Sequence, residues 1–217
     1  MSSKTLAQCL EVFNRKERYW LIRNCCGNGT DLSLPLSDAI IEKLTKKFTE
    51  LLNADLKNAW WAMDYHIDWL IAALTRYNGQ NEENKTIQNI NYKIFGTQED
   101  FDFIICTENT LIFIEAKLSS VWDRKQLDSK IKRLNGMKEL FKSTKQYFVL
   151  LSPGFQNIES TKDYVTNELT SMRTGYICLE TPPQTTDGSR FLKVIRCDEN
   201  RTADKDGAFW KTSPCSR

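Results

Sequence analysis

The 217-residue sequence predicts an α/β domain with a central mixed β-sheet and helices on its faces. Three observations support this fold class. Hydrophobic residues make up 41% of the chain and charged residues 27%, which is typical of a folded globular protein. The longest apolar runs are far shorter than the roughly 20 residues that a membrane helix needs. From residue 58 onward, stretches with helical spacing alternate with short strand-like stretches, an order typical of a sheet covered by helices.

The first expected unit is a helical N-terminal extension, residues 1–57. Its first helical stripe begins at Leu6 and ends before Gly27. A second helix follows Ser37, a residue type that favours helix N-caps, and repeats apolar residues such as Leu44 at helical spacing.

The second expected unit is a domain at 58–197, and a loose polar tail at 198–217 follows it. The domain begins with a helix at 58–77, because apolar residues recur there on one helical face. The elements expected after it are a strand at 90–94, strands at 101–106 and 111–117, a helix at 123–141, a strand at 147–151, a helix at 159–172, and a C-terminal strand pair at 176–180 and 191–197.

Composition excludes several kinds of site and partner. No hydrophobic signal region begins the chain, so we expect a cytoplasmic protein with no membrane partner and with reduced cysteines. His66 is the single histidine, which excludes sites that need two imidazoles, and the scattered cysteines argue against zinc. A metal ion here would need oxygen ligands, which suits Mg²⁺ or Mn²⁺.

The strands at 101–106 and 111–117 are predicted to form a hairpin. If Glu108 and Asn109 make a two-residue turn, Asp102 faces Glu115 across the two strands. Because side chains alternate between the two faces of a strand, the remaining residues divide into two sets. One face carries Asp100, Asp102, Glu115 and Lys117, and the other carries Phe101, Phe103, Ile105, Ile112, Ile114 and Ala116.

Facing carboxylates in hydrophobic strands repel each other and are costly to bury. A divalent cation would compensate Asp102 and Glu115, and an ammonium at Lys117 could position a water or stabilise charge on a phosphate. The alternative is a solvated strand face on which Lys117 only neutralises its neighbours. The alternation of apolar residues on the other face favours the catalytic interpretation.

These residues resemble the PD-(D/E)XK, or restriction-endonuclease-like, nuclease superfamily. The similarity covers residues 58–153 and rests on D-F-I-I at Asp102, on I-F-I-E-A-K-L with Glu115 and Lys117, and on the long helix that follows. The resemblance implies a core of helix, three-stranded meander, helix and strand. It also implies that Asp102 and Glu115 bind Mg²⁺ or Mn²⁺ while Lys117 assists the attacking water. The proline that often precedes the aspartate is replaced by Phe101.

The superfamily often adds an acidic residue from its first core helix to the metal site. On the helix expected at 58–77, Asp64 and Asp68 flank the same side of the apolar stripe, whereas His66 lies on the opposite margin. We therefore favour Asp64 and Asp68 over His66 as additional metal ligands, and we expect Glu17 to belong to a surface charge cluster.

The segment 117–145 gathers nine Lys or Arg residues against three acids. Such a cationic helix could follow a nucleic-acid backbone, although a solvated helix face explains it equally well. The candidate nucleic-acid-binding residues are Arg124, Lys125, Gln126, Lys130, Lys132 and Arg133.

The sequence thus predicts a metal-dependent nuclease, with DNA favoured over RNA as the substrate. A homodimer is an open alternative, because cutting both strands of a duplex needs two sites. The rival hypothesis is a non-catalytic module on the same fold that binds nucleic acid or a protein.

Overall fold

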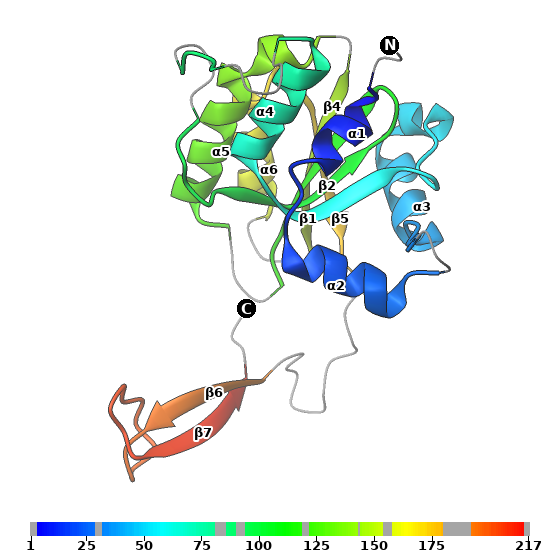
Figure 1. The fold of residues 1–217 in the computed structure, drawn as a ribbon. Coiled ribbons are helices and arrows are strands. Elements are labelled where there is room, and N and C mark those ends of the chain that lie inside the picture. The colour runs from blue at the N-terminus through cyan, green and yellow to red at the C-terminus, as the bar shows by residue number, and fades with distance from the viewer. Residues whose placement is uncertain are drawn as a thin grey trace.

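Figure 1 shows the fold of the protein in a computed structural model. The structure describes residues 4–28, 32–80, 86–89, 94–118, 122–142, 144–153, 158–179 and 192–214. The strand expected at 90–94 therefore lies almost entirely outside the described residues, and the one described position, Ile94, is not in a strand.

A five-stranded mixed sheet forms the centre of the fold, which confirms the predicted α/β class. Its strands lie side by side in chain order, antiparallel between the first three and parallel between the last three. The strands are β1 (Trp60–His66), β2 (Asp100–Cys106), β3 (Thr110–Ala116), β4 (Lys145–Ser152) and β5 (Arg173–Cys178).

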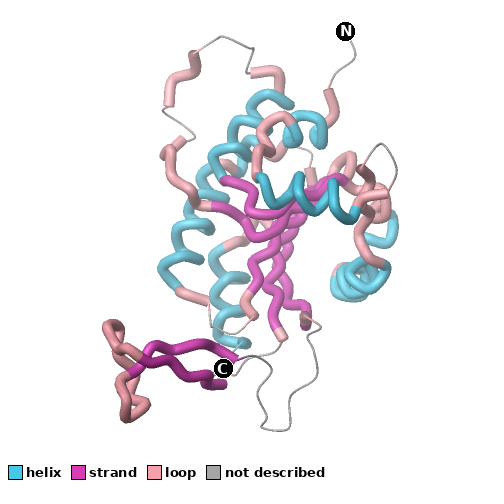
Figure 2. Tube along the Cα trace, turned by 60° about the horizontal axis from the view of Figure 1, so that its bottom comes forward, coloured by secondary structure: helices cyan, strands magenta, loops and turns pink. Residues whose placement is uncertain are grey.

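Helices cover both faces of this sheet. They are α1 (Leu6–Glu11), α2 (Glu17–Cys26), α3 (Asp38–Lys47), α4 (Ile67–Tyr77), α5 (Arg124–Gly136) and α6 (Ile158–Glu168), with short 3-10 helices η1 (Thr49–Asn53) and η2 (Lys138–Leu140). Figures 1 and 2 show α4, α5 and α6 along one face, with α3 on the other side. The parallel strands require crossover connections, and α5 and α6 supply them.

The N-terminal helices contribute to the core of the sheet domain. Leu6, Leu10, Tyr19 and Leu44 are buried in the same apolar cluster as the strands. The Tyr65 hydroxyl donates a hydrogen bond to the Leu10 carbonyl at 2.9 Å, which ties α1 to β1. The described helices before residue 57 are therefore packed against the strands that carry the candidate site.

The expected helix at 58–77 is wrong over its first half, because β1 occupies Trp60–His66 and α4 begins only at Ile67. Two tryptophans and a tyrosine favour a strand here. Buried residues occur on both faces of β1, among them Trp61, Ala62 and Tyr65, so the strand lacks the alternation that normally identifies one.

The predicted β2–β3 hairpin is confirmed in its register. Phe103 pairs with Ile114 and Cys106 pairs with Leu111, the pairing that a two-residue turn requires. Within the turn, the Thr107 amide donates to the Thr110 carbonyl at 3.0 Å.

The predicted face of Phe101 is wrong. Its ring lies 4.7 Å from the ring of Phe113, on the side of the sheet that carries Glu115. The neighbouring strand β1 is irregular at the same level, where Asp64 has a φ of 50° between two ladder pairs of β1 and β2. A residue in this conformation breaks the strict alternation of side chains along a strand.

The C-terminal region differs from the expectation in two ways. The strand β5 pairs with β4 in the main sheet, and not with the strand that follows it. That following strand, β6 (Leu192–Cys197), pairs with β7 (Phe209–Pro214) in a separate two-stranded sheet, so the expectation of a loose tail is wrong at β7. In the described part of the chain, no helix is long and apolar enough to cross a bilayer.

Candidate active site

The candidate site lies where β2 begins and β3 ends. The β2–β3 ladder runs as far as Phe103 and Ile114, so Asp102 and Glu115 are the next residues on neighbouring strands. The confirmed register therefore brings both predicted carboxylates to the same level of the sheet.

Asp102 holds the two strands together at this point. Its Oδ2 accepts a hydrogen bond from the Ala116 amide at 2.7 Å, in the region where the backbone ladder has ended. The carboxylate thus satisfies a strand N–H that would otherwise need a backbone carbonyl. The side chain is half-buried, so it is positioned by the backbone and still accessible.

Glu115 is buried, with 4% of its surface exposed. Burial raises the pKa of Glu115 to about 7; the nearby Asp102 charge acts in the same direction, and Lys130 opposes it. The Lys130 ammonium, from α5, lies 2.5 Å from Glu115 Oε1. The carboxylate is therefore held in an apolar environment whose nearest positive charge comes from a neighbouring helix.

Lys117 follows β3 and extends its pairing with β4 through its backbone, since its amide donates to the Leu151 carbonyl at 2.9 Å. Its side chain is half-buried, and its charge lowers the pKa of Glu115. Within the described ranges, its ammonium forms no ion pair. It is thus the uncommitted cation next to the two carboxylates.

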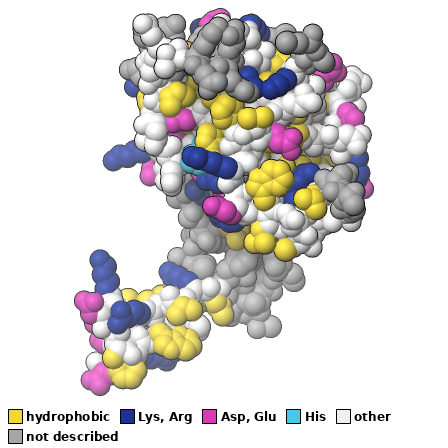
Figure 3. Space-filling model, viewed as in Figure 1, with side chains coloured by type: hydrophobic (Ala, Val, Ile, Leu, Met, Phe, Trp, Pro, Cys, Tyr) yellow, Lys and Arg dark blue, Asp and Glu magenta, His cyan; other side chains and the backbone are white. Residues whose placement is uncertain are grey.

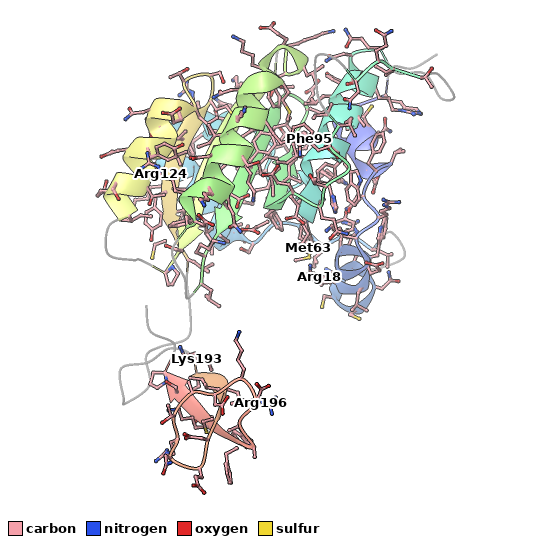
Figure 4. All side chains as sticks on the ribbon, turned by 90° about the vertical axis from the view of Figure 1, so that its left-hand side faces the viewer. Arg18, Met63, Phe95, Arg124, Lys193 and Arg196 are labelled. Atoms are coloured by element: carbon pink, nitrogen blue, oxygen red, sulfur yellow. The ribbon has the colours of Figure 1, made fainter. Side chains whose placement is uncertain are left out.

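Asp64 lies level with Asp102, because the pairs Met63–Phe103 and Tyr65–Phe101 flank the two aspartates. Its Oδ2 is 2.8 Å from a guanidinium nitrogen of Arg18 on α2. This Oδ2 is buried and accepts no hydrogen bond from the described residues. Its contact with Arg18 is therefore electrostatic. Figure 4 shows Arg18 beside Met63, the residue before Asp64. Asp64 therefore lies close to Asp102 in the sheet, but it belongs to strand β1 and not to the predicted helix.

Asp68 is committed elsewhere. It lies in the first turn of α4, where its carboxylate pairs with Arg133 of α5 and accepts hydrogen bonds from the amides of Phe95 and Gly96. The structure therefore does not bring Asp68 together with Asp102 and Glu115, and its observed partners are those of a buried structural aspartate.

A second cluster next to Asp102 involves residues that the sequence did not group together. His66 pairs in register with Asp100, and its ring stacks on Trp69 at 4.1 Å. Lys16 bonds Asp100 at 3.2 Å. Burial and Lys16 lower the pKa of His66, while Asp100 opposes them. No local signal relates Lys16 to Asp100, which lie 84 positions apart in the chain.

The predicted nucleic-acid-binding residues divide into exposed and engaged sets. Arg124, Lys125, Gln126 and Lys132 are exposed on α5, and the Arg124 guanidinium lies over the Tyr164 ring at 4.2 Å. Lys130 is engaged with Glu115. Arg133 is buried between Asp68 and Glu99, so it cannot reach a nucleic-acid backbone in this structure.

The donor set at Asp102 and Glu115 fits a hard divalent cation. Mg²⁺ is commonly held by one or two carboxylates, with water and phosphate oxygens completing its coordination. A buried carboxylate with a raised pKa gains from a nearby positive charge. Among the described residues, no group of three acids, cysteines or histidines converges to form a closed metal site.

The raised pKa of Glu115 predicts a pH-dependent stability. Between about pH 4.5 and 7 the folded protein keeps a proton that the unfolded chain has lost, so stability falls as pH rises through this window. Glu115→Gln mimics the protonated form. We expect the free energy of unfolding of the parent to fall by about 2 kcal/mol more than that of the variant between pH 5 and 8.

Urea unfolding at several pH values measures this difference. Glu108→Gln, in the exposed turn of the same hairpin, is the matched control and should follow the parent. Parallel pH profiles for the parent and Glu115→Gln would show that Glu115 has an ordinary pKa.

No protein-family model matches the chain, and neither a curated protein nor a solved structure matches it at a significant level.

Proposed function

We propose that this protein is a metal-dependent phosphodiesterase that hydrolyses nucleic acid, with DNA as the preferred substrate. The observation that carries the proposal is the β2–β3 register, in which Asp102 and Glu115 directly follow the last pair, Phe103 and Ile114, while Lys117 comes immediately after β3. A pair of carboxylates and a free ammonium at one end of a sheet suits hydrolysis of a phosphodiester.

The proposed metal ion is Mg²⁺ or Mn²⁺, held by Asp102 and Glu115. When bound, it would neutralise phosphate charge and favour ionisation of water. Asp102 is oriented for this role by the Ala116 amide. Lys117 would hold the attacking water or the developing negative charge through its uncommitted ammonium.

The order of elements supports a restriction-endonuclease-like core as part of the proposal. Three antiparallel strands are followed by α5 and by the parallel strand β4. The insertion of α4 between β1 and β2 departs from a simple meander. The proposal therefore depends on the carboxylates and Lys117 more than on topology.

One observation favours the rival function, a non-catalytic binding module. The Glu115 carboxylate already has a cationic partner in Lys130, at 2.5 Å. A metal ion at Glu115 would have to share that carboxylate with Lys130 or displace it. If Lys130 serves only to neutralise Glu115, the exposed cations of α5 would bind nucleic acid without cleaving it.

Cleavage assays separate the two functions. The protein is incubated with circular single-stranded DNA, circular duplex DNA or structured RNA, in Mg²⁺, Mn²⁺ or EDTA. We expect metal-dependent cleavage, strongest on DNA, which EDTA abolishes and Glu115→Gln reduces by at least about 100-fold. Circular substrates also reveal internal cuts.

The control is Glu139→Gln, an exposed acid in η2 that should cut like the parent. If the folded protein binds nucleic acid in a salt-sensitive way but cleaves none of the substrates, the proposed activity is contradicted. That result would favour the binding module.

A further inference from the structure

The β6–β7 hairpin exposes one complete face. The register pairs Arg196 with Trp210, and residues two apart along each strand share their side. Val194 is 70% exposed and Trp210 69%, high values for large apolar side chains. The exposed face consists of Leu192, Val194, Arg196, Trp210, Thr212 and Pro214.

Charge is divided along this hairpin. The charged residues within the two strands are all cations, Lys193, Arg196 and Lys211. The acids lie in the connection between the strands, at Asp198, Glu199, Asp204 and Asp206, together with Arg201 and Lys205. Figure 3 shows acidic and basic side chains at the outer end of the hairpin, with hydrophobic ones along its length.

The exposed cation Arg196 and the exposed ring of Trp210 occupy facing positions on the two strands. Arg196 Nε donates to the Gly207 carbonyl at 3.0 Å, which fixes the stem of the side chain while the residue remains exposed. Figure 4 shows Lys193 and Arg196 projecting from the hairpin. Trp210 lies directly across the ladder from Arg196. A planar ring and a guanidinium on the same exposed face suit an unstacked base and its phosphate.

Two-stranded hairpins gain little stability on their own, so an exposed apolar face of this kind is expected to be covered by a ligand. In the described part of the chain, β6 and β7 pair only with each other, and Figure 1 shows them outside the helical layers. Because every charged residue within the two strands is a cation, the strands favour a polyanion over an apolar protein surface.

We propose that the β6–β7 hairpin binds single-stranded nucleic acid, with a base stacked on Trp210 and the backbone held by Arg196. A single strand is specified because the bases of a duplex are already stacked on one another. This inference rests on the proposed function in taking nucleic acid as the ligand, and it deepens that function by assigning the hairpin as a substrate arm separate from Asp102, Glu115 and Lys117.

Fluorescence anisotropy with a labelled single-stranded DNA of about 20 nucleotides, in EDTA and over a range of KCl concentrations, tests this arm. The full chain is compared with Trp210→Ala, Trp210→Phe and Arg196→Gln. Thr202→Ala, exposed in the connection between the two strands, is the matched control. Circular dichroism and thermal unfolding verify that each variant is folded.

We expect Trp210→Ala to weaken binding on the order of 10-fold or more, whereas Trp210→Phe retains most of it because a phenyl ring still stacks. Arg196→Gln should reduce the slope of log K against log salt by about 0.7. Thr202→Ala should bind like the parent.

Unchanged affinity in both Trp210→Ala and Arg196→Gln would overturn the inference. Self-association that is lost in Trp210→Ala, without any effect on DNA binding, would also overturn it and assign the face to a second copy of the chain. The two proposals fail separately. If the parent protein binds DNA through Trp210 but cleaves no substrate in Mg²⁺, only the proposed activity is contradicted. If the parent cleaves DNA and Trp210→Ala binds DNA as tightly as the parent, only this inference is contradicted.

Discussion

Lys117→Ala is expected to lower the rate of cleavage by a factor on the order of 10² to 10⁴ while leaving the fold intact. The reason is that the ammonium of Lys117 forms no ion pair in the described part of the structure, so it is available to a water or a phosphate. Its structural contact is made by the backbone amide, which bonds Leu151 and remains in the variant.

Single-turnover cleavage kinetics measure the rate, and calorimetric titration with Mn²⁺ measures metal binding. Lys117→Met preserves the length of the side chain, and it should lose activity to the same extent as Lys117→Ala if the charge is what matters. Lys125→Ala, which removes an exposed cation in the first turn of α5, is the control for a general loss of positive charge.

A Lys117→Ala variant that cuts as fast as the parent would remove Lys117 from the mechanism. If the variant keeps the single-turnover cleavage rate of the parent at saturating DNA but binds DNA more weakly, Lys117 is one phosphate contact among several. Metal affinity should stay close to that of the parent, because Asp102 and Glu115 supply the protein ligands of the proposed metal.

The hairpin that carries the site could be predicted because its geometry is local. A two-residue turn determines which residues of two short strands face each other, and a shift by one residue would move every apolar side chain to the wrong face. The pairing of Phe103 with Ile114 confirms that reasoning. It did not extend to Phe101, which lies beyond the last β2–β3 pair, at the level where the backbone of Asp64 on a third strand is irregular.

The strand β1 could not be recognised in the same way. Its apolar residues lie on both faces, and by coincidence Trp60, Met63 and Ile67 follow helical spacing into α4. Pairing with β2 decides the structure, and that is a long-range interaction. Asp64 and Asp68 were therefore placed on one helix although they belong to different elements.

The roles of two cations on α5 were also missed. Counting charges makes 117–145 a basic segment, yet Lys130 and Arg133 border the apolar stripe formed by Leu127, Ile131 and Leu134. Long cationic side chains at such positions can reach buried acids. Their partners, Glu115 and Asp68, come from other elements, so only the assembled fold identifies them.

Arg133→Ala is expected to destabilise the protein by about 3 to 5 kcal/mol, because it leaves the buried Asp68 carboxylate without its cation. Arg133 is 7% exposed and pairs with Asp68 and with Glu99, the latter at 3.3 Å. Its guanidinium also lies 4.6 Å from the centre of the Phe95 ring.

This ion network holds the segment that leads into β2. Asp68 accepts the amides of Phe95 and Gly96 while it binds Arg133, and the Glu99 carbonyl accepts the amide of Ile67 at 3.0 Å. Residues 95–99 are therefore anchored to α4 and α5 immediately before Asp100 and Asp102. Loss of the guanidinium should loosen this approach to the candidate site as well as lower global stability.

Urea unfolding measures the loss of stability, and hydrogen exchange of the amides of Phe95 and Gly96 measures the local loosening. Lys132→Ala, the exposed neighbour on α5, should change stability by less than about 0.5 kcal/mol. Arg133→Lys should recover only part of the stability, because a lysine cannot present the forked donors that reach two carboxylates at once. If Arg133→Ala instead matched Lys132→Ala in stability and exchange, the buried pair would contribute nothing to the fold, and the position of β2 would depend on apolar packing alone.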